Sequence, residues 1–362
     1  MNFLDLEAEV IDDLDAGISV QLKSAPGRGK SQFVEQLVKK LSQRDGFEWG
    51  FATMFLATQT PPDLIGYQFK GERTWDNETV AVTDPTLPLW MVTRSGKPTW
   101  HYKRGILFLD EYGQGEADVK RASAELLLNK TIGPWTLGGH NAEGWGVIAA
   151  SNRASDRSGV TKEFDFVINR RGEYDVTDDI NAWVDWATAN GVSPLTIAFA
   201  VQNTQIIFQD VVPEKQGPWC TPRSLVMLDR KMQVKQKRIG VFPDDAKTVE
   251  GAMGLIGAGA AQYFAFVRLE KEMPRFEAIV ASPTQVKVPQ KPDAQMLVVY
   301  NLAHRVDAKT IKPVIEYIER MPKEFAVTFA KAACKRNGEL VLHPAMRQWS
   351  TQNASLMAAL TA

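Results

Sequence analysis

The stretch Ser24-Ala25-Pro26-Gly27-Arg28-Gly29-Lys30-Ser31 decides how the first part of this 362-residue chain folds. Its glycines let the backbone approach an anion closely, and its amide groups can surround phosphate oxygens at the start of a helix. Lys30 adds a positive charge for the β and γ phosphates, and the Ser31 hydroxyl is a suitable ligand for Mg²⁺. The strict pattern has glycine at the position of Ser24, where a small residue still permits the tight turn. The pattern predicts a phosphate-binding loop for ATP, with contacts from Ala25, Pro26, Gly27, Arg28, Gly29, Lys30, Ser31 and Gln32.

The residues on either side of this loop have the periodicity that the motif requires. Residues 18–22 alternate between apolar and polar side chains, which predicts a strand. Residues 32–43 place Phe33, Leu37 and Leu41 at helical spacing. A strand, a glycine-rich loop and a helix in this order are the context in which a phosphate-binding loop works.

Two further apolar runs end in polar residues. Residues 105–109 lead into Asp110 and Glu111, and residues 147–150 lead towards Asn152. Continuous apolar runs of this length are typical of parallel strands that are covered on both faces, and ligands gather at the carboxyl ends of such strands. We therefore expect Asp110 to hold Mg²⁺ together with the serine of the loop, Glu111 to activate water, and Asn152 to position that water.

Three arginines downstream can bring positive charge to the phosphates. Arg170 and Arg171 follow residues 164–168, which look like a short strand, and either arginine can reach the nucleotide of a neighbouring subunit. Arg223 begins a predicted helix directly after a proline and can contact the γ phosphate from a helical lid. The alternative for all three is an exposed cation with no partner in the site.

Composition limits the classes of protein. Hydrophobic residues make up 44% of the chain and charged residues 23%, and the net charge of −1 shows no overall basic surplus for nucleic acid. The N-terminus is acidic where a signal peptide is basic, and the longest apolar stretch, residues 252–267, is too short to cross a membrane. The two cysteines, Cys220 and Cys334, form no metal-binding pattern. We expect a cytoplasmic protein with reduced thiols.

Two other segments allow more than one interpretation. Residues 60–103 contain five prolines and six aromatic residues, which either grip a partner or pack as an insert. The basic run at residues 230–238 is either a solvated helix face or a contact for nucleic acid.

In this order, these elements resemble the MoxR branch of the AAA+ ATPases, close to the dynein-related group, over roughly residues 15–235. Arg171 stands where the branch has Phe in its Asn-Arg-Phe stretch, so either Arg170 or Arg171 can be the arginine finger, and the position in the motif favours Arg170. The segments that resemble the branch are Pro62-Asp63-Leu64-Ile65-Gly66, Gly105-Ile106-Leu107-Phe108-Leu109-Asp110-Glu111, Ser151-Asn152-Arg153, Ile168-Asn169-Arg170-Arg171 and Trp219-Cys220-Thr221-Pro222-Arg223-Ser224.

The resemblance implies an α/β P-loop NTPase core of the AAA+ type with a central parallel sheet, followed by a helical lid and an α-helical C-terminal extension. We place the nucleotide-binding domain at 1–178, the lid at 179–243 and the extension at 244–362. The resemblance further implies ATP hydrolysis in a homo-oligomeric, hexameric ring that remodels a protein client, with a von Willebrand A-type protein as one candidate, in a bacterium or a phage within one. Two alternatives stay open, a motor directed by nucleic acid and an ATP-binding scaffold that hydrolyses little.

Overall fold

The computed structural model describes residues 1–156, 158–270 and 273–354, so the last residues of the predicted extension, 355–362, lie outside it. The chain divides into two compact units. The first comprises Met1–Asp179 with Asp210–Val212, and the second comprises Ile180–Gln209 with Pro213–Ala362. The phosphate-binding loop lies in the first unit, while the helices predicted to form the lid and the extension lie in the second.

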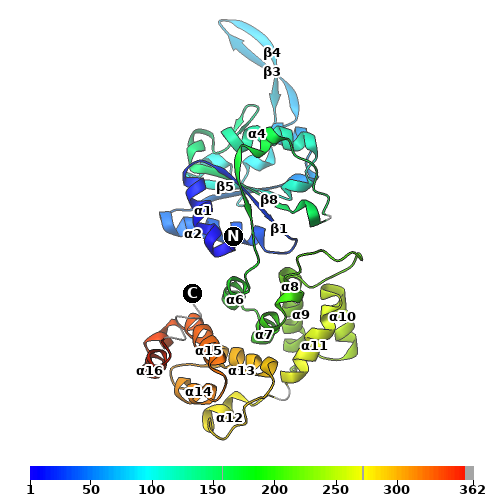
Figure 1. Ribbon diagram of the computed structural model, residues 1–362. Helices are drawn as coiled ribbons and strands as arrows, with labels where there is room; N and C mark the ends of the chain where they lie inside the picture. Colours follow the sequence, from blue (N-terminus) through cyan, green and yellow to red (C-terminus); the bar gives the residue numbers. More distant parts are fainter. Residues whose placement is uncertain (157, 271–272, 355–362) are drawn as a thin grey trace. The chain divides into compact units, whose positions relative to one another are not determined.

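The first unit is built on a parallel five-stranded sheet with the strand order β2-β5-β8-β1-β9 (Figure 1). The loop strand β1 is therefore an interior strand, between β8 and β9. The strands are β1 (Ser19–Ser24), β2 (Gly50–Phe55), β5 (Gly105–Asp110), β8 (Trp145–Asn152) and β9 (Arg171–Asp175). The helices of this unit are α1 (Phe3–Asp15), α2 (Lys30–Asp45), α3 (Pro61–Ile65), α4 (Ala117–Asn129) and α5 (Asp165–Ile168).

The alternation of side chains along the strands separates two apolar cores, one on each face of the sheet. Ile106 and Phe108 belong to the core that contains the buried residues of α1 and α2. Leu107 and Leu109 belong to the core that contains the buried residues of α3 and α4. All four side chains are fully buried, each stabilising the fold by about 1.5–3 kcal/mol. This burial on both faces is why β5 is a continuous apolar run.

The segment 60–103, which the sequence left open, contains an antiparallel hairpin of β3 (Gln68–Trp75) and β4 (Glu78–Pro85). Asp76 and Asn77 form its two-residue turn with φ values of 49° and 69°, which matches the twist of the strands. Figure 1 shows the hairpin extending away from the rest of the first unit, and Trp75 is exposed near its tip. Trp90, in contrast, is buried and donates its indole N–H to the carbonyl of Leu64 at 2.8 Å. The segment is thus part packed insert and part exposed hairpin.

The second unit is helical and has two apolar cores. The first core lies among the helices α6 to α11 with part of α13, and the second among α12 to α16. The first core runs past residue 243, where the sequence analysis placed the end of the lid, into α10 and α11. The helices are α6 (Ile180–Ala189), α7 (Pro194–Gln202), α8 (Thr204–Ile207), α9 (Pro222–Ile239), α10 (Ala246–Ile256), α11 (Gly259–Glu270), α12 (Phe276–Ala281), α13 (Pro292–Arg305), α14 (Ile311–Ile318), α15 (Lys323–Arg336) and α16 (Pro344–Gln352).

One sequence prediction about secondary structure is wrong. Residues 164–168 were expected to form a short strand, but the structure has the single helical turn α5 there. A local hydrogen bond supports the turn, since the guanidinium of Arg171 donates to the carbonyl of Val167, four residues earlier, at 3.2 Å. Among the helices that the structure describes, none is both long and apolar enough to cross a membrane.

Candidate nucleotide-binding site

The predicted phosphate-binding loop connects β1 to α2, as the sequence requires. Gly27 and Gly29 have φ values of +75° and +94°, which favour glycine. A Cβ at Gly29 would meet no atom within 4 Å, so the loop is open on that side. Helix α2 begins at Lys30, and its N-cap residue is Gly29, which has no side chain to form a cap. Ala25 is buried, while Gln32 is exposed in the first turn of α2.

Lys30 is buried, and its ammonium group contacts two strand ends. Its Nζ donates to the hydroxyl of Ser24 at 2.9 Å and to the amide oxygen of Asn152 at 3.2 Å. Ser24 and Asn152 are register partners on β1 and β8, which is why both reach the same atom. The serine that replaces the glycine of the strict pattern therefore supplies an acceptor for Lys30.

Ser31 and Asp110 meet although they are 79 residues apart in sequence. The Ser31 hydroxyl donates to Oδ2 of Asp110 at 2.8 Å, because the start of α2 lies over the carboxyl end of β5. Hydroxyl and carboxylate oxygens are the ligands that Mg²⁺ prefers, and Mg²⁺ in such sites takes its remaining ligands from phosphates and water. Together with the amide groups at the start of α2, this donor set fits a magnesium-bound nucleotide.

Glu111 has an unusual backbone conformation. Its φ of 52° and ψ of 34° are left-handed, which costs about 1–2 kcal/mol for a residue with a Cβ. The next two residues hold it there, since Tyr112 is fully buried and Gly113 packs so closely that a Cβ would lie 2.8 Å from Cβ of Ser151. Strained backbone of this kind occurs often at functional sites. The Glu111 side chain itself is exposed, which gives its carboxylate access to water.

Arg28 has a partner that the sequence did not indicate. Its Nε lies 2.8 Å from Oδ1 of Asp178, and its side chain is only 4% exposed. Burial lowers the pKa of Arg28, an effect that Asp178 opposes, and burial raises the pKa of Asp178, which Arg28 opposes. The loop is thus tied to the last residues of the first unit. No motif reveals this pair, because it joins residues 150 positions apart.

The two adjacent arginines differ sharply in their surroundings. The Arg171 side chain is 0% exposed and binds Glu163 and Glu173 at 2.7 and 2.6 Å. Burial acts to lower the pKa of Arg171, but the hydrogen bonds and charges of its partners raise it overall. A buried arginine held by two carboxylates cannot extend to another subunit. We therefore withdraw Arg171 as an arginine finger and retain Arg170.

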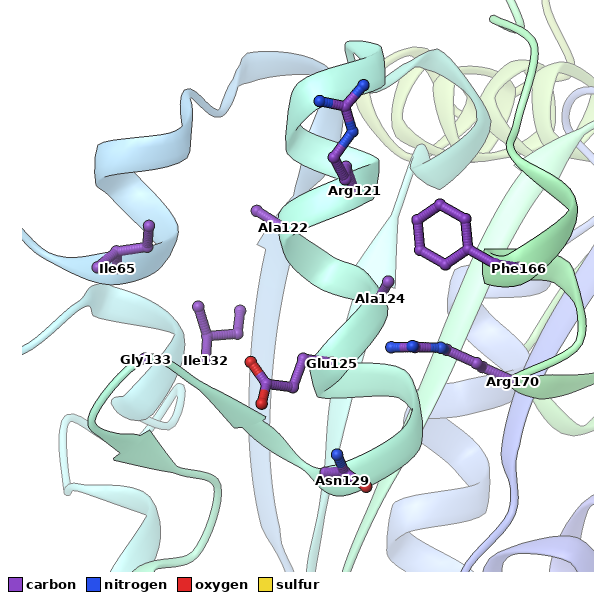
Figure 2. Close-up of a pocket in the computed structure, with 10 residues that line it drawn as sticks. All are labelled: Ile65, Arg121, Ala122, Ala124, Glu125, Asn129, Ile132, Gly133, Phe166 and Arg170. Carbon is purple, nitrogen blue, oxygen red and sulfur yellow. The ribbon is translucent and has the colours of Figure 1, made fainter.

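Arg170 lines a surface hollow of about 430 Å³. Figure 2 shows its side chain and that of Phe166 extending toward α4, which contributes Arg121 and Glu125 to the rim. The guanidinium carbon of Arg170 lies 5.5 Å from the centre of the Phe166 ring, a cation–π contact that supports an extended side chain. Arg170 is thus partly exposed at the surface, where a second molecule can approach it.

Arg223 belongs to the second unit. It is the exposed second residue of α9, after the capping residue Thr221 and Pro222. The Thr221 side chain accepts a hydrogen bond from the amide of Ser224 at 3.1 Å, which fixes the start of the helix. The structure brings together Lys30, Ser31, Asp110 and Asn152 in the first unit, and Arg223 stays a prediction.

Comparisons with known proteins give only distant similarities. No protein-family model matches the chain, and no curated protein matches it. A candidate ATPase from Cytophaga hutchinsonii is 13% identical, with a TM-score of 0.33 over 91% of this chain and 79% of that one. NtrX from Brucella abortus in complex with ATP is 13% identical, with a TM-score of 0.37 over 98% of this chain and 68% of that one. Because these identities and TM-scores are low, the fold rests on the structure of this chain alone. Its parallel sheet and the loop between β1 and α2 form an α/β P-loop NTPase fold.

Proposed function

We propose that this chain is an ATP-hydrolysing AAA+ ATPase of the MoxR type, which assembles into a hexameric ring and remodels or activates a partner protein. One observation carries the proposal. Lys30, Asn152 and the Ser31–Asp110 pair meet at the carboxyl ends of the neighbouring strands β1, β8 and β5. This is the edge of a parallel sheet at which ligands bind.

Each residue of the site then has a role. Ser31 and Asp110 would hold Mg²⁺, which when bound neutralises phosphate charge during transfer. Lys30 exchanges its contacts with Ser24 and Asn152 for phosphate oxygens. Glu111 takes the proton of the attacking water, which Asn152 helps to place. Arg170, which is partly exposed and lies over the Phe166 ring, is the group suited to reach the γ phosphate of a neighbouring subunit.

Three further parts of the proposal rest on the resemblance to the MoxR branch. They are the contact of Arg223 with the γ phosphate from the lid, the hexameric count, and a client of the von Willebrand A type. An affinity measurement separates the first from the rest. If Arg223 contacts the γ phosphate, Arg223→Ala should weaken ATP binding or slow turnover. If Arg223 only faces solvent, the substitution should change neither.

The test is ATP turnover measured against protein concentration. We expect the rate per subunit of the wild type to rise with concentration, because each site is completed by a neighbour. Lys30→Ala should lose ATP binding, whereas Lys40→Ala is the matched control because Lys40 is exposed and forms an ion pair with Glu7 on α1. Glu111→Gln should bind ATP without hydrolysing it. A wild type without turnover, alone or with added protein or DNA, would leave only a nucleotide-stabilised scaffold.

One observation favours a second candidate, a motor directed by nucleic acid. Helix α9 exposes Arg223, Arg230, Lys237 and Arg238, while its one acid, Asp229, is buried. Such a basic helix face would bind phosphates in a salt-dependent manner. DNA or RNA that stimulates turnover, and loses this effect when Arg230 and Lys237 are changed to Gln, would favour the motor over the protein remodeller.

A further inference from the structure

The loop that follows the predicted water-activating residue is joined to a segment about 50 positions later. In the loop 112–115, the Gly113 carbonyl accepts from the amide of Thr161 at 2.9 Å. The same carbonyl accepts from Nζ of the buried Lys120 at 2.8 Å, and that ammonium also donates to the Thr161 hydroxyl at 2.7 Å. Because these groups are shielded from water, their hydrogen bonds fix the loop and the segment 161–171 as one body.

A buried chain of three side chains runs through this body. The Tyr112 hydroxyl donates to Oε1 of Glu163 at 2.9 Å, and burial raises the pKa of Tyr112, which keeps it protonated as a donor. Both terminal nitrogens of Arg171 bind the two oxygens of Glu163, at 2.8 and 2.7 Å. The Arg171 guanidinium also lies 5.2 Å from the centre of the Tyr112 ring. A bidentate pair constrains both distance and orientation.

The two ends of this chain are the immediate neighbours of the two residues proposed to act in hydrolysis. Tyr112 follows Glu111, and Arg171 follows Arg170. The Arg171 guanidinium also donates to the carbonyl of Val167 at 3.2 Å, which fixes the turn α5 that leads to Arg170. A change in the loop at Glu111 would therefore be transmitted to the segment that presents Arg170.

We propose that Tyr112, Glu163 and Arg171 are positioning residues that couple the orientation of Arg170 to the loop of Glu111 in the same subunit. The inference rests on the proposed function, in which Glu111 serves its own site and Arg170 serves the next. A subunit would thereby connect two neighbouring ATP sites in the ring through a buried polar chain. None of the three residues touches the nucleotide in this scheme.

The test places the change in a subunit that does not hydrolyse ATP. Rings are mixed from Arg170→Ala subunits, which keep an intact site, and Lys30→Ala subunits, which supply only Arg170. Glu163→Gln is then added to the Lys30→Ala subunits. Glu7→Gln is the matched control, because Glu7 also binds a cation, Lys40, but lies on α1. Turnover arises only at sites next to a supplied Arg170, so a role of Glu163 confined to hydrolysis in its own subunit would not change it.

We expect Glu163→Gln to lower the recovered turnover about tenfold or more without changing KM for ATP. The reason is that a displaced Arg170 slows the chemical step but leaves ATP binding intact. Glu7→Gln should leave the recovery unchanged. Tyr112→Phe, which keeps the ring and the ion pair, should lower it several-fold, and it decides the case if Glu163→Gln does not fold. If turnover with Glu163→Gln or Tyr112→Phe recovers to the same level as with the Glu7→Gln control, the positioning role is overturned. An inactive wild type, or an Arg170→Ala protein as active as the wild type, instead refutes the proposed function.

Discussion

Replacing Arg171 by methionine should destabilise the first unit strongly. The guanidinium is 0% exposed and holds Glu163, whose side chain is 13% exposed, and Glu173, which is 28% exposed. Methionine can fill much of the space but leaves Glu163 without its cation, while Glu173 keeps its ion pair with Lys23 at 2.5 Å. Removing one partner of a buried pair costs about 3–5 kcal/mol. In a unit of this size, each kcal/mol shifts the unfolding midpoint by about 2–4 °C, so we expect a fall of roughly 6–20 °C.

The adjacent residue provides the matched control. Arg170→Met removes a partly exposed guanidinium that lies over the ring of Phe166, so we expect its midpoint to stay within about 2 °C of the wild type, as for most surface substitutions. Thermal unfolding by circular dichroism gives the midpoints. Hydrogen exchange of peptides from β9 then assigns the change to the first unit. Equal midpoints for the two variants would refute the reading of Arg171 as a buried structural cation.

Three further predictions concern pH, packing and the metal. Burial lowers the pKa of Lys130 from 10.5 to about 8, so the unfolded chain binds more protons between these values. The wild type should therefore gain stability relative to Lys130→Met as pH rises from 8 to 10, and a constant difference in midpoint would contradict this. A Cβ at Gly105 would lie 2.6 Å from the ring of Trp145, so Gly105→Ala should lower the free energy of unfolding, measured in urea, by about 1–3 kcal/mol. Gly254→Ala is the control, because its Cβ would meet open space within α10 and should not destabilise the protein. Ser31→Ala should weaken ATP binding in calorimetry about 10- to 100-fold with Mg²⁺ and little in EDTA, and an equal loss in both would remove Ser31 from the metal site.

The sequence by itself determined the elements of the nucleotide site. The glycines and Lys30 set the conformation and charge of the loop, and the apolar run before Asp110 set a strand covered on both faces. These signals are local, because glycine at positive φ and alternating or continuous apolar patterns express constraints between near neighbours. The meeting of Ser31 with Asp110 and of Lys30 with Asn152 also followed, since the carboxyl ends of parallel strands lie at one edge.

Only the tertiary structure decided which of two adjacent arginines is free to act. In sequence, the position in the motif favoured Arg170, but both Arg170 and Arg171 stayed open as candidates. The distinction depends on Tyr112 and Glu163, which fold over Arg171 from positions that share no pattern with it. The helical turn at 165–168 depends on the same residues, because Arg171, which donates to the carbonyl of Val167, is itself held by Glu163. Long-range contacts of this kind depend on where the chain brings side chains together, and no local rule encodes them.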